Sequence, residues 1–130
     1  MALVVDDDPG MRKLVKDLLV WEGIDTHELS DGDCLVREVE EEKVSLVVLD
    51  KEMPSVSGLD LVPYLSRRWP QVPVIVITAF GGPAARAEAM ARGATVYLDK
   101  PFRVGDFLRA VRQALGAEPG PAVPQVNRRT

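Results

Sequence analysis

Short apolar runs alternate along this chain with segments whose apolar residues recur every three to four positions. Residues 3–5, 44–49, 74–77 and 96–98 are apolar almost throughout, as in strands covered on both faces. Residues 24–29 instead alternate apolar and polar side chains, which is typical of an edge strand half open to solvent. The pattern therefore predicts five strands separated by helices.

The segments between the runs have the spacing of amphipathic helices. The first helix opens at Asp8-Pro9-Gly10 and ends at Gly23. Proline is well tolerated in the first turn of a helix, because an N–H at that position has no acceptor within the helix. We expect its buried face to be Met11, Leu14, Val15, Leu18 and Leu19. The second helix is expected to bury Leu35, Val36 and Val39 and to expose its run of glutamates.

Three further helices are predicted. One carries Leu59, Leu61, Val62 and Leu65, and its Pro63 either lies in a first turn that starts near Asp60 or kinks the helix. The next, residues 84–92, has Met90 as its one large apolar side chain, so it should pack weakly and be mobile, and Gly93 should end it. The last, residues 104–115, places these apolar side chains on one stripe: Val104, Phe107, Leu108, Val111 and Leu115.

Five strands alternating with five helices predict an α/β fold with a doubly wound parallel sheet and right-handed crossovers. The flavodoxin-like order 2-1-3-4-5 suits the runs, because it places the polar second strand at an edge. Residues 1–116 form one domain in this interpretation. Residues 117–130 contain three prolines and no apolar period, which indicates a linker or a disordered tail.

Composition narrows the class of protein. The chain has 130 residues, enough for one domain with a real core. Its net charge of −4 argues against direct contact with nucleic acid, so any DNA binding would belong to another domain or chain. A single cysteine, Cys34, excludes an internal disulfide, and no apolar run approaches the length of a membrane span. The first strand begins almost at once, without room for a signal peptide, so we expect a cytoplasmic protein.

Reactive side chains follow four of the five strands. Asp6 and Asp7 follow the first, Asp50 the third, Thr78 the fourth and Lys100 the fifth. In an open parallel sheet the carboxyl ends of the strands meet at the edge where ligands bind, so these groups should converge. Carboxylates with a lysine and a hydroxyl suit a hydrated divalent cation and a phosphoryl group. Two carboxylates about 4 Å apart repel by roughly 4 kcal/mol at an effective dielectric of 20, and a cation would relieve this repulsion.

Four motifs in order along the chain resemble those of response-regulator receiver domains of two-component signalling systems. They are Val5-Asp6-Asp7-Asp8-Pro9, Asp50-Lys51-Glu52-Met53-Pro54 followed by Gly58, Ile77-Thr78-Ala79, and Lys100-Pro101-Phe102. The resemblance covers residues 2 to about 116. It implies that Asp50 accepts a phosphoryl group from a phosphohistidine, giving an acyl phosphate that water later removes.

The resemblance also implies a Mg²⁺ cofactor. Its ligands would be Asp6, Asp7 and Asp50, one of the first two through water, together with the main-chain carbonyl of Glu52. Asp8 is expected to cap the following helix instead. In the family, variable positions such as Lys51 and Glu52 modulate loss of the phosphoryl group, and the direction of the Glu52 effect stays open.

Three more residues receive roles from the resemblance. Lys100 would pair with a phosphate oxygen, and the peptide bond before Pro101 is often cis in receivers. Thr78 would donate a hydrogen bond to the phosphoryl group and move toward it, while the small Ala79 leaves the phosphate accessible. Tyr97 would then turn from solvent toward the core. This switch would alter the surface formed by the fourth helix, fifth strand and fifth helix.

The implied function is signalling, without catalytic turnover beyond the chain's own phosphorylation and dephosphorylation. Partners would be a sensor histidine kinase, an output domain that regulates transcription and, on phosphorylation, a second copy of the chain; we expect no membrane contact. A free-standing phosphorelay receiver is the alternative output. An aspartyl-phosphate phosphatase is a further alternative, although such enzymes have a second Asp where this chain has Glu52. His27 is expected to be exposed and inert.

Overall fold

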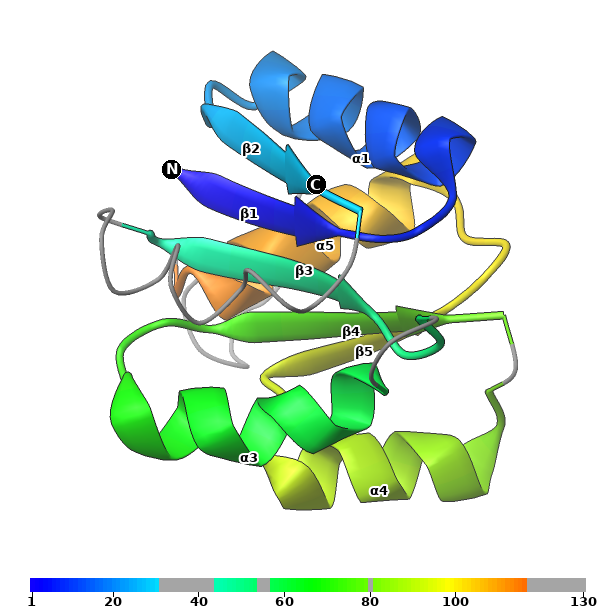
Figure 1. Cartoon of the computed structure of the whole chain (residues 1–130). Helices are drawn as coiled ribbons and strands as arrows, with labels where there is room; N and C mark the ends of the chain where they lie inside the picture. The colour runs from blue at the N-terminus through cyan, green and yellow to red at the C-terminus, as the bar shows by residue number, and fades with distance from the viewer. Residues whose placement is uncertain (31–43, 54–56, 80, 117–130) are drawn as a thin grey trace.

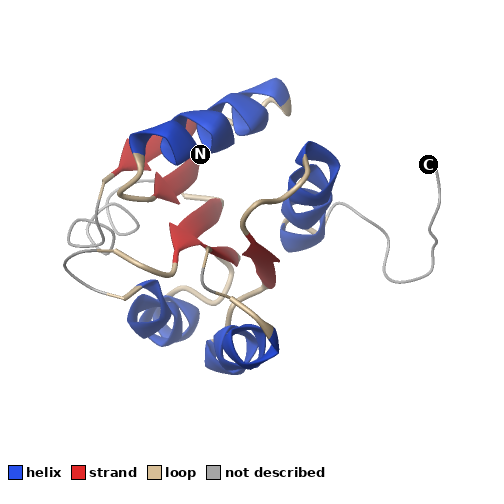
Figure 2. Cartoon of the chain, turned by 90° about the vertical axis from the view of Figure 1, so that its right-hand side faces the viewer, coloured by secondary structure: helices blue, strands red, loops and turns tan. Residues whose placement is uncertain are grey.

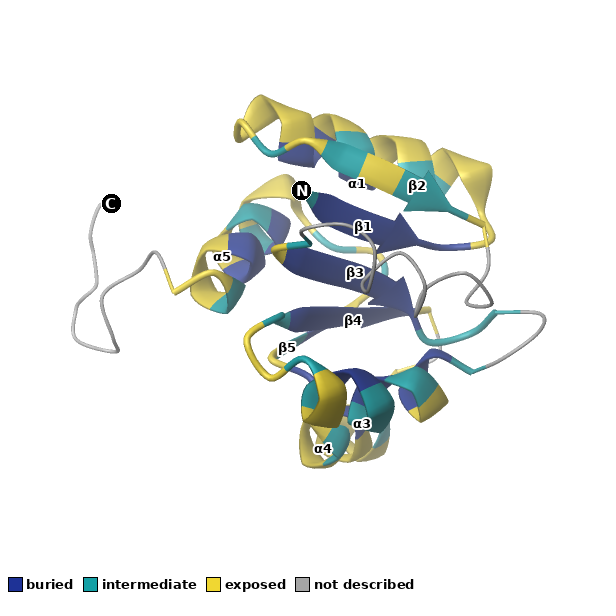
Figure 3. Ribbon diagram, turned by 60° about the vertical axis from the view of Figure 1, so that its left-hand side comes forward, coloured by how far each residue is buried: buried dark blue, intermediate teal, exposed yellow. Residues whose placement is uncertain are grey.

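A five-stranded parallel sheet forms the centre of the computed structural model, which describes residues 1–30, 44–53, 57–79 and 81–116. The order is β2-β1-β3-β4-β5, as the sequence predicts (Figure 1). The strand bounds are β1 Ala2–Val5, β2 Thr26–Leu29, β3 Leu46–Asp50, β4 Val74–Thr78 and β5 Val96–Asp99. β1, β3 and β4 are buried throughout and β2 is only partly buried, because it lies at the edge of the sheet (Figure 3).

The described helices cover both faces of the sheet. They are α1 Pro9–Trp21, α3 Gly58–Arg68, α4 Pro83–Arg92 and α5 Val104–Ala114. α1 and α5 pack with one set of strand side chains, and α3 and α4 pack with the other (Figures 1 and 2). The predicted second helix falls in residues 31–43, outside the described part of the chain. None of the helices in the described ranges is long and apolar enough to cross a membrane.

The helices α1 and α5 bury narrower stripes than the sequence pattern predicts. In α1, Val15, Leu18 and Leu19 are buried, while the prediction is wrong for Leu14, which is 41% exposed. In α5, the buried residues are Phe107, Ala110 and Val111, and the predicted Val104 and Leu115 are exposed. A helix on a sheet meets it along one line, so apolar residues at the side or ends of the helix stay in solvent.

The helix α3 starts at Gly58, two residues before Asp60, so Pro63 does not lie in its first turn. Ser57 caps it by accepting a hydrogen bond from the Leu59 N–H at 3.2 Å. Pro63 therefore lies inside the helix and cannot donate to the Leu59 carbonyl four residues earlier. Arg92 of α4 supplies that missing donor, since its Nη1 lies 3.2 Å from the Leu59 oxygen.

The helix α4 is held by small side chains and by its last residue. Ala89 is its buried residue, while Met90 is 41% exposed, so the large side chain does not anchor it. Arg92 pairs with Asp60 of α3 and Glu88 of α4. Gly93 ends the helix at φ 116°, in the left-handed conformation that the sequence predicts.

Candidate functional site

The predicted side chains converge at the carboxyl ends of β1, β3, β4 and β5, the edge that faces the viewer in Figure 2. Asp6, Asp50 and Thr78 are buried, and Asp7 is exposed. One carboxylate oxygen each from Asp6, Asp7 and Asp50 lies within 4.8 Å of the others. The parallel register produces this cluster, because it ends neighbouring strands at the same level.

The loop between β1 and α1 fixes Asp6 in the site. The Asp8 N–H donates to Asp6 Oδ1 at 2.9 Å, and Asp8 Oδ1 accepts from the Gly10 N–H at 2.9 Å. Asp8 therefore caps α1, as predicted. Arg12 donates to the main-chain oxygen of Asp6 at 2.7 Å. Sequence reasoning missed Arg12; its one signal was a cation in the first turn of a helix, where the helix dipole disfavours it.

Lys100 lies between two of the carboxylates. Its Nζ is 3.2 Å from Asp6 Oδ2 and 3.5 Å from Asp50 Oδ1, and its peptide bond to Pro101 is cis, as the resemblance implies. Burial lowers the pKa of Lys100, but Asp50 and Asp6 more than offset this and the pKa is raised. Lys100 is therefore a firmly charged ammonium inside the cluster.

Asp50 is an acid that holds its proton more tightly than usual. Burial and the neighbouring Asp6 raise its pKa to about 6, against the opposing effect of Lys100. Its Oδ1 is buried and, within the described residues, accepts no hydrogen bond. The Lys100 ammonium 3.5 Å away compensates this anionic oxygen only in part, because Asp6 shares that ammonium, so the site favours a further positive charge.

The donor set fits Mg²⁺. This cation prefers one or two carboxylates completed by waters and phosphate oxygens, and an exposed Asp7 beside buried Asp6 and Asp50 leaves one side open to solvent. The predicted role of the Glu52 main-chain carbonyl as a ligand stays a prediction.

Thr78 and Glu52 form a contact that the sequence does not reveal. The Thr78 hydroxyl donates to Glu52 Oε1 at 2.6 Å, and Lys51 Nζ lies 3.0 Å from Glu52 Oε2. Glu52 and Lys51 belong to the loop after β3, so their side-chain directions depend on loop conformation. Only their place next to Asp50 in the chain indicated that they lie near the site.

Tyr97 is buried, whereas the sequence-based expectation gave it a solvent-facing position before phosphorylation. Its hydroxyl donates to Asp99 Oδ1 at 2.7 Å. Burial and this carboxylate raise the pKa of Tyr97 to about 12. A Cβ at Gly81 would overlap the Tyr97 hydroxyl and Asp99 Oδ1, so the glycine makes room for this pair. His27 is exposed on β2, as expected.

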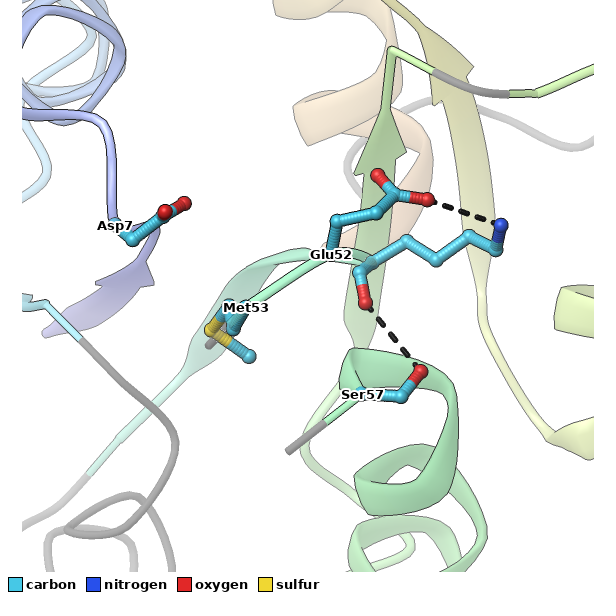
Figure 4. Close-up of a pocket in the computed structure, with 5 residues that line it drawn as sticks. Asp7, Glu52, Met53 and Ser57 are labelled. Carbon is cyan, nitrogen blue, oxygen red and sulfur yellow. Dashed lines mark hydrogen bonds and ion pairs between the residues drawn. The ribbon is translucent and has the colours of Figure 1, made fainter. Parts of the chain in front are cut away.

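The first residue of α3, Gly58, lies very close to the main chain of Asp50. A Cβ at Gly58 would overlap the main-chain carbonyl of Asp50, and the Gly58 N–H donates to the Lys51 carbonyl at 2.8 Å. This close approach explains the glycine of the motif. Beside it lies an open pocket of about 450 Å³, whose lining includes Asp7, Glu52, Met53 and Ser57 (Figure 4).

Residues 2–112 match the family described as the response regulator receiver domain. The chain is 35% identical to the response regulator protein FleR of Pseudomonas aeruginosa over 120 residues, which are 92% of this chain and 25% of that protein. It is 37% identical to PilR of the same organism, over 88% of this chain and 26% of that protein. The chain thus spans about a quarter of the length of these curated relatives.

Solved structures agree with the fold. The receiver domain of NtrX from Brucella abortus superposes with a TM-score of 0.83 at 29% identity, covering 91% of this chain and 100% of that one. The beryllofluoride-activated NtrC4 receiver domain dimer gives a TM-score of 0.84 at 28% identity, covering 89% and 96%.

Proposed function

Since the chain belongs to the response regulator receiver domain family, we propose that Asp50 is its phosphoacceptor and that a sensor histidine kinase is the donor. The observation that carries the proposal is the arrangement around Asp50. The buried Asp50 carboxylate lies beside the Lys100 ammonium and the carboxylates of Asp6 and Asp7. Asp50 ends β3, and the neighbouring strand β4 ends in the buried Thr78.

The chemistry follows from these positions. An oxygen of the Asp50 carboxylate attacks phosphorus, the bond from phosphorus to the histidine nitrogen breaks, and the imidazole leaves with the bonding electrons. Lys100, already within 3.5 Å of Asp50, pairs with a phosphoryl oxygen. Asp6, Asp7 and Asp50 would hold Mg²⁺, which when bound neutralises charge on the phosphoryl oxygens. With its pKa at about 6, Asp50 is mainly the nucleophilic carboxylate at neutral pH.

The signal would leave through the surface of α4, β5 and α5. Thr78 ends β4 beside Asp99 of β5 in the sheet register, and Tyr97 packs in the same core as Ala89 of α4. A phosphoryl group adds a charge of about −1.5 to −2 at the start of this path. Leu98 of β5 packs against the core that contains Phe107 of α5, so a change at Thr78 would reach all three elements as a shift between two populated states.

We place the receiver domain at residues 1–116, with 117–130 as a linker to an output domain. Relatives named as transcriptional regulators are about two to four times as long as the matched segment, which favours a regulatory output for this chain as well. We further propose that the protein is cytoplasmic and that it dimerises on phosphorylation. The dimerisation is supported by the NtrC4 receiver domain, which is a dimer when activated with beryllofluoride.

The test is intact mass after incubation with acetyl phosphate and Mg²⁺. We expect the wild-type chain to gain one phosphoryl group, and Asp50→Asn or added EDTA to prevent the gain. Asp17→Asn, an exposed carboxylate on α1, is the matched control and should be labelled like the wild type. No gain on the wild type, or equal labelling of Asp50→Asn, would contradict the proposal.

A further inference from the structure

The hydroxyl of Thr78 already has a strong acceptor in the unphosphorylated chain. It donates to a carboxylate oxygen of Glu52 at 2.6 Å, and Thr78 is fully buried. A hydrogen bond to a charged acceptor is shorter and roughly twice as strong as one between neutral groups. Breaking this bond therefore costs the Thr78 hydroxyl a charge-assisted partner, which the phosphoryl group would have to replace.

Glu52 is itself held in the orientation that makes this contact. Glu52 Oε2 forms an ion pair with Lys51 Nζ at 3.0 Å (Figure 4) and, among the described residues, accepts no hydrogen bond, while Oε1 accepts the Thr78 hydroxyl. Glu52 lies two residues after Asp50, in the loop that leads from β3 toward α3. It therefore places a negative charge beside the position of a phosphoryl group on Asp50.

The proposed function requires the same Thr78 proton for a phosphoryl oxygen. A hydroxyl has one proton to donate, so Thr78 cannot serve Glu52 and the phosphoryl group with full strength at once. The phosphoryl charge would also repel the Glu52 carboxylate. Both effects oppose the phosphorylated state for as long as Glu52 stays where it is.

We propose that Glu52 is a positioning residue that holds the Thr78 hydroxyl in the unphosphorylated state and must release it when a phosphoryl group binds. This inference rests on the proposed function. It assigns the Glu52 side chain a role that acts through Thr78, in addition to any effect on the water that removes the phosphoryl group. Glu52 thereby sets how strongly phosphoryl binding is linked to movement of Thr78.

The test is the affinity of the chain for beryllofluoride, a phosphoryl mimic, in Mg²⁺ buffer. The binding is monitored by the NMR signal of the Thr78 amide. We expect Glu52→Ala to bind about tenfold more tightly than the wild type, since one charge-assisted hydrogen bond no longer competes. Glu52→Gln, which keeps an acceptor oxygen but loses the charge, should lie between the two. Glu22→Gln, at the C-terminal cap of α1, is the matched control and should bind like the wild type.

A double-mutant cycle with Thr78→Val separates the proposed role from simple charge removal. In the Thr78→Val background, Glu52→Ala should gain clearly less than in the wild type, because there is no hydroxyl to release. Without beryllofluoride, χ1 couplings of Thr78 should report one rotamer in the wild type and averaging in Glu52→Ala.

The outcomes distinguish the two proposals. Equal affinity of the wild type and Glu52→Ala, or an equal gain in both Thr78 backgrounds, would overturn the role of Glu52 while leaving Asp50 as phosphoacceptor. Absence of beryllofluoride binding in every variant, together with no phosphoryl gain from acetyl phosphate, would overturn the proposed function; the χ1 couplings would then still show whether Glu52 holds Thr78.

Discussion

The ionised carboxylate of Asp50, which the proposed function needs, lowers the stability of the folded chain because it is buried. Its pKa is about 6 in the folded chain and 3.8 in the absence of structure. The folded state therefore binds more protons between these values, so the contribution of Asp50 to stability is present below pH 4 and is lost as the pH rises through about 6. We expect Asp50→Asn, in metal-free buffer, to be about 2 kcal/mol more stable than the wild type at pH 7.5.

The measurement is urea unfolding of both proteins between pH 4 and pH 8. The difference should shrink steadily as the pH falls toward 4, where the wild-type carboxyl is protonated when folded. Asp17→Asn, which removes an exposed carboxylate on α1, should show no such pH-dependent gain. A constant difference for Asp50→Asn across the range would mean that its carboxylate is not destabilised by its surroundings.

The reactive residues differ in how far the sequence reveals them. Asp6 and Lys100 directly follow strands and Asp50 ends one, and a parallel sheet aligns strand ends whatever the loops do. The contacts of Glu52 and Arg12 depend instead on rotamers and loop conformation. Their side chains therefore could not be placed from residue types alone. Tyr97 was assigned to the correct strand, but its buried orientation depends on Asp99 and on the space that Gly81 leaves.

The contact between α3 and α4 rests on a hydrogen bond that a proline makes necessary. Pro63 leaves the Leu59 carbonyl without its helical donor, and the Arg92 guanidinium donates to it and to Asp60. We expect Arg92→Met to lower the free energy of unfolding by about 1 to 2 kcal/mol, because the carbonyl loses its donor and the ion pairs are lost. Chemical denaturation monitored by circular dichroism measures this change.

A second substitution tests the cause. Pro63→Ala restores the helical N–H, so Arg92→Met should destabilise the Pro63→Ala chain by a smaller amount than the wild type. Arg109→Met is the matched control, since Arg109 forms an exposed pair with Asp106 within α5, and its loss should have little effect in either background. Equal losses from Arg92→Met with and without Pro63 would show that the carbonyl is not what Arg92 stabilises.

The positions of helices and strands along the chain are predicted from the sequence better than the faces that the helices bury. The apolar runs and the caps at Asp8 and Gly93 place the described strands and helices nearly where the structure has them. The buried stripes of α1 and α5 are narrower than the periodicity suggests, because periodicity does not report how wide a surface the sheet offers. The start of α3 at Gly58 was not predicted, because the capping role of Ser57 is not evident from the motif in which it lies.

At the scale of the whole molecule, the topology concentrates carboxylates at one edge of a sheet whose central strands are apolar. Two buried cores cover its faces, and both are built by β1, which Asp6 follows, and by β3 and β4, which end in Asp50 and Thr78. The strand order was predictable, because the polar run at residues 24–29 fits an edge and the apolar runs fit the centre. Folding thus creates the acidic cluster, and the unfolded chain has none.

Because the cluster exists only in the folded chain, Mg²⁺ should stabilise the whole molecule. A ligand that binds the folded state alone adds about 2.7 kcal/mol at a hundred times its Kd. We expect the Tm to rise by several degrees with Mg²⁺ concentration, as measured by differential scanning calorimetry. The rise should weaken below about pH 6, where Asp50 takes up a proton that competes with the cation.

The controls separate binding from general screening of charge. Sodium chloride at matched ionic strength should give little of the rise, since screening acts weakly on buried groups. Asp6→Asn and Asp7→Asn should each reduce the Mg²⁺-dependent rise, whereas Asp17→Asn should keep it, because Asp17 lies on α1 away from the cluster. A Tm that does not depend on Mg²⁺, or a rise that persists when both Asp6 and Asp7 are replaced, would contradict a cation site at this edge of the sheet.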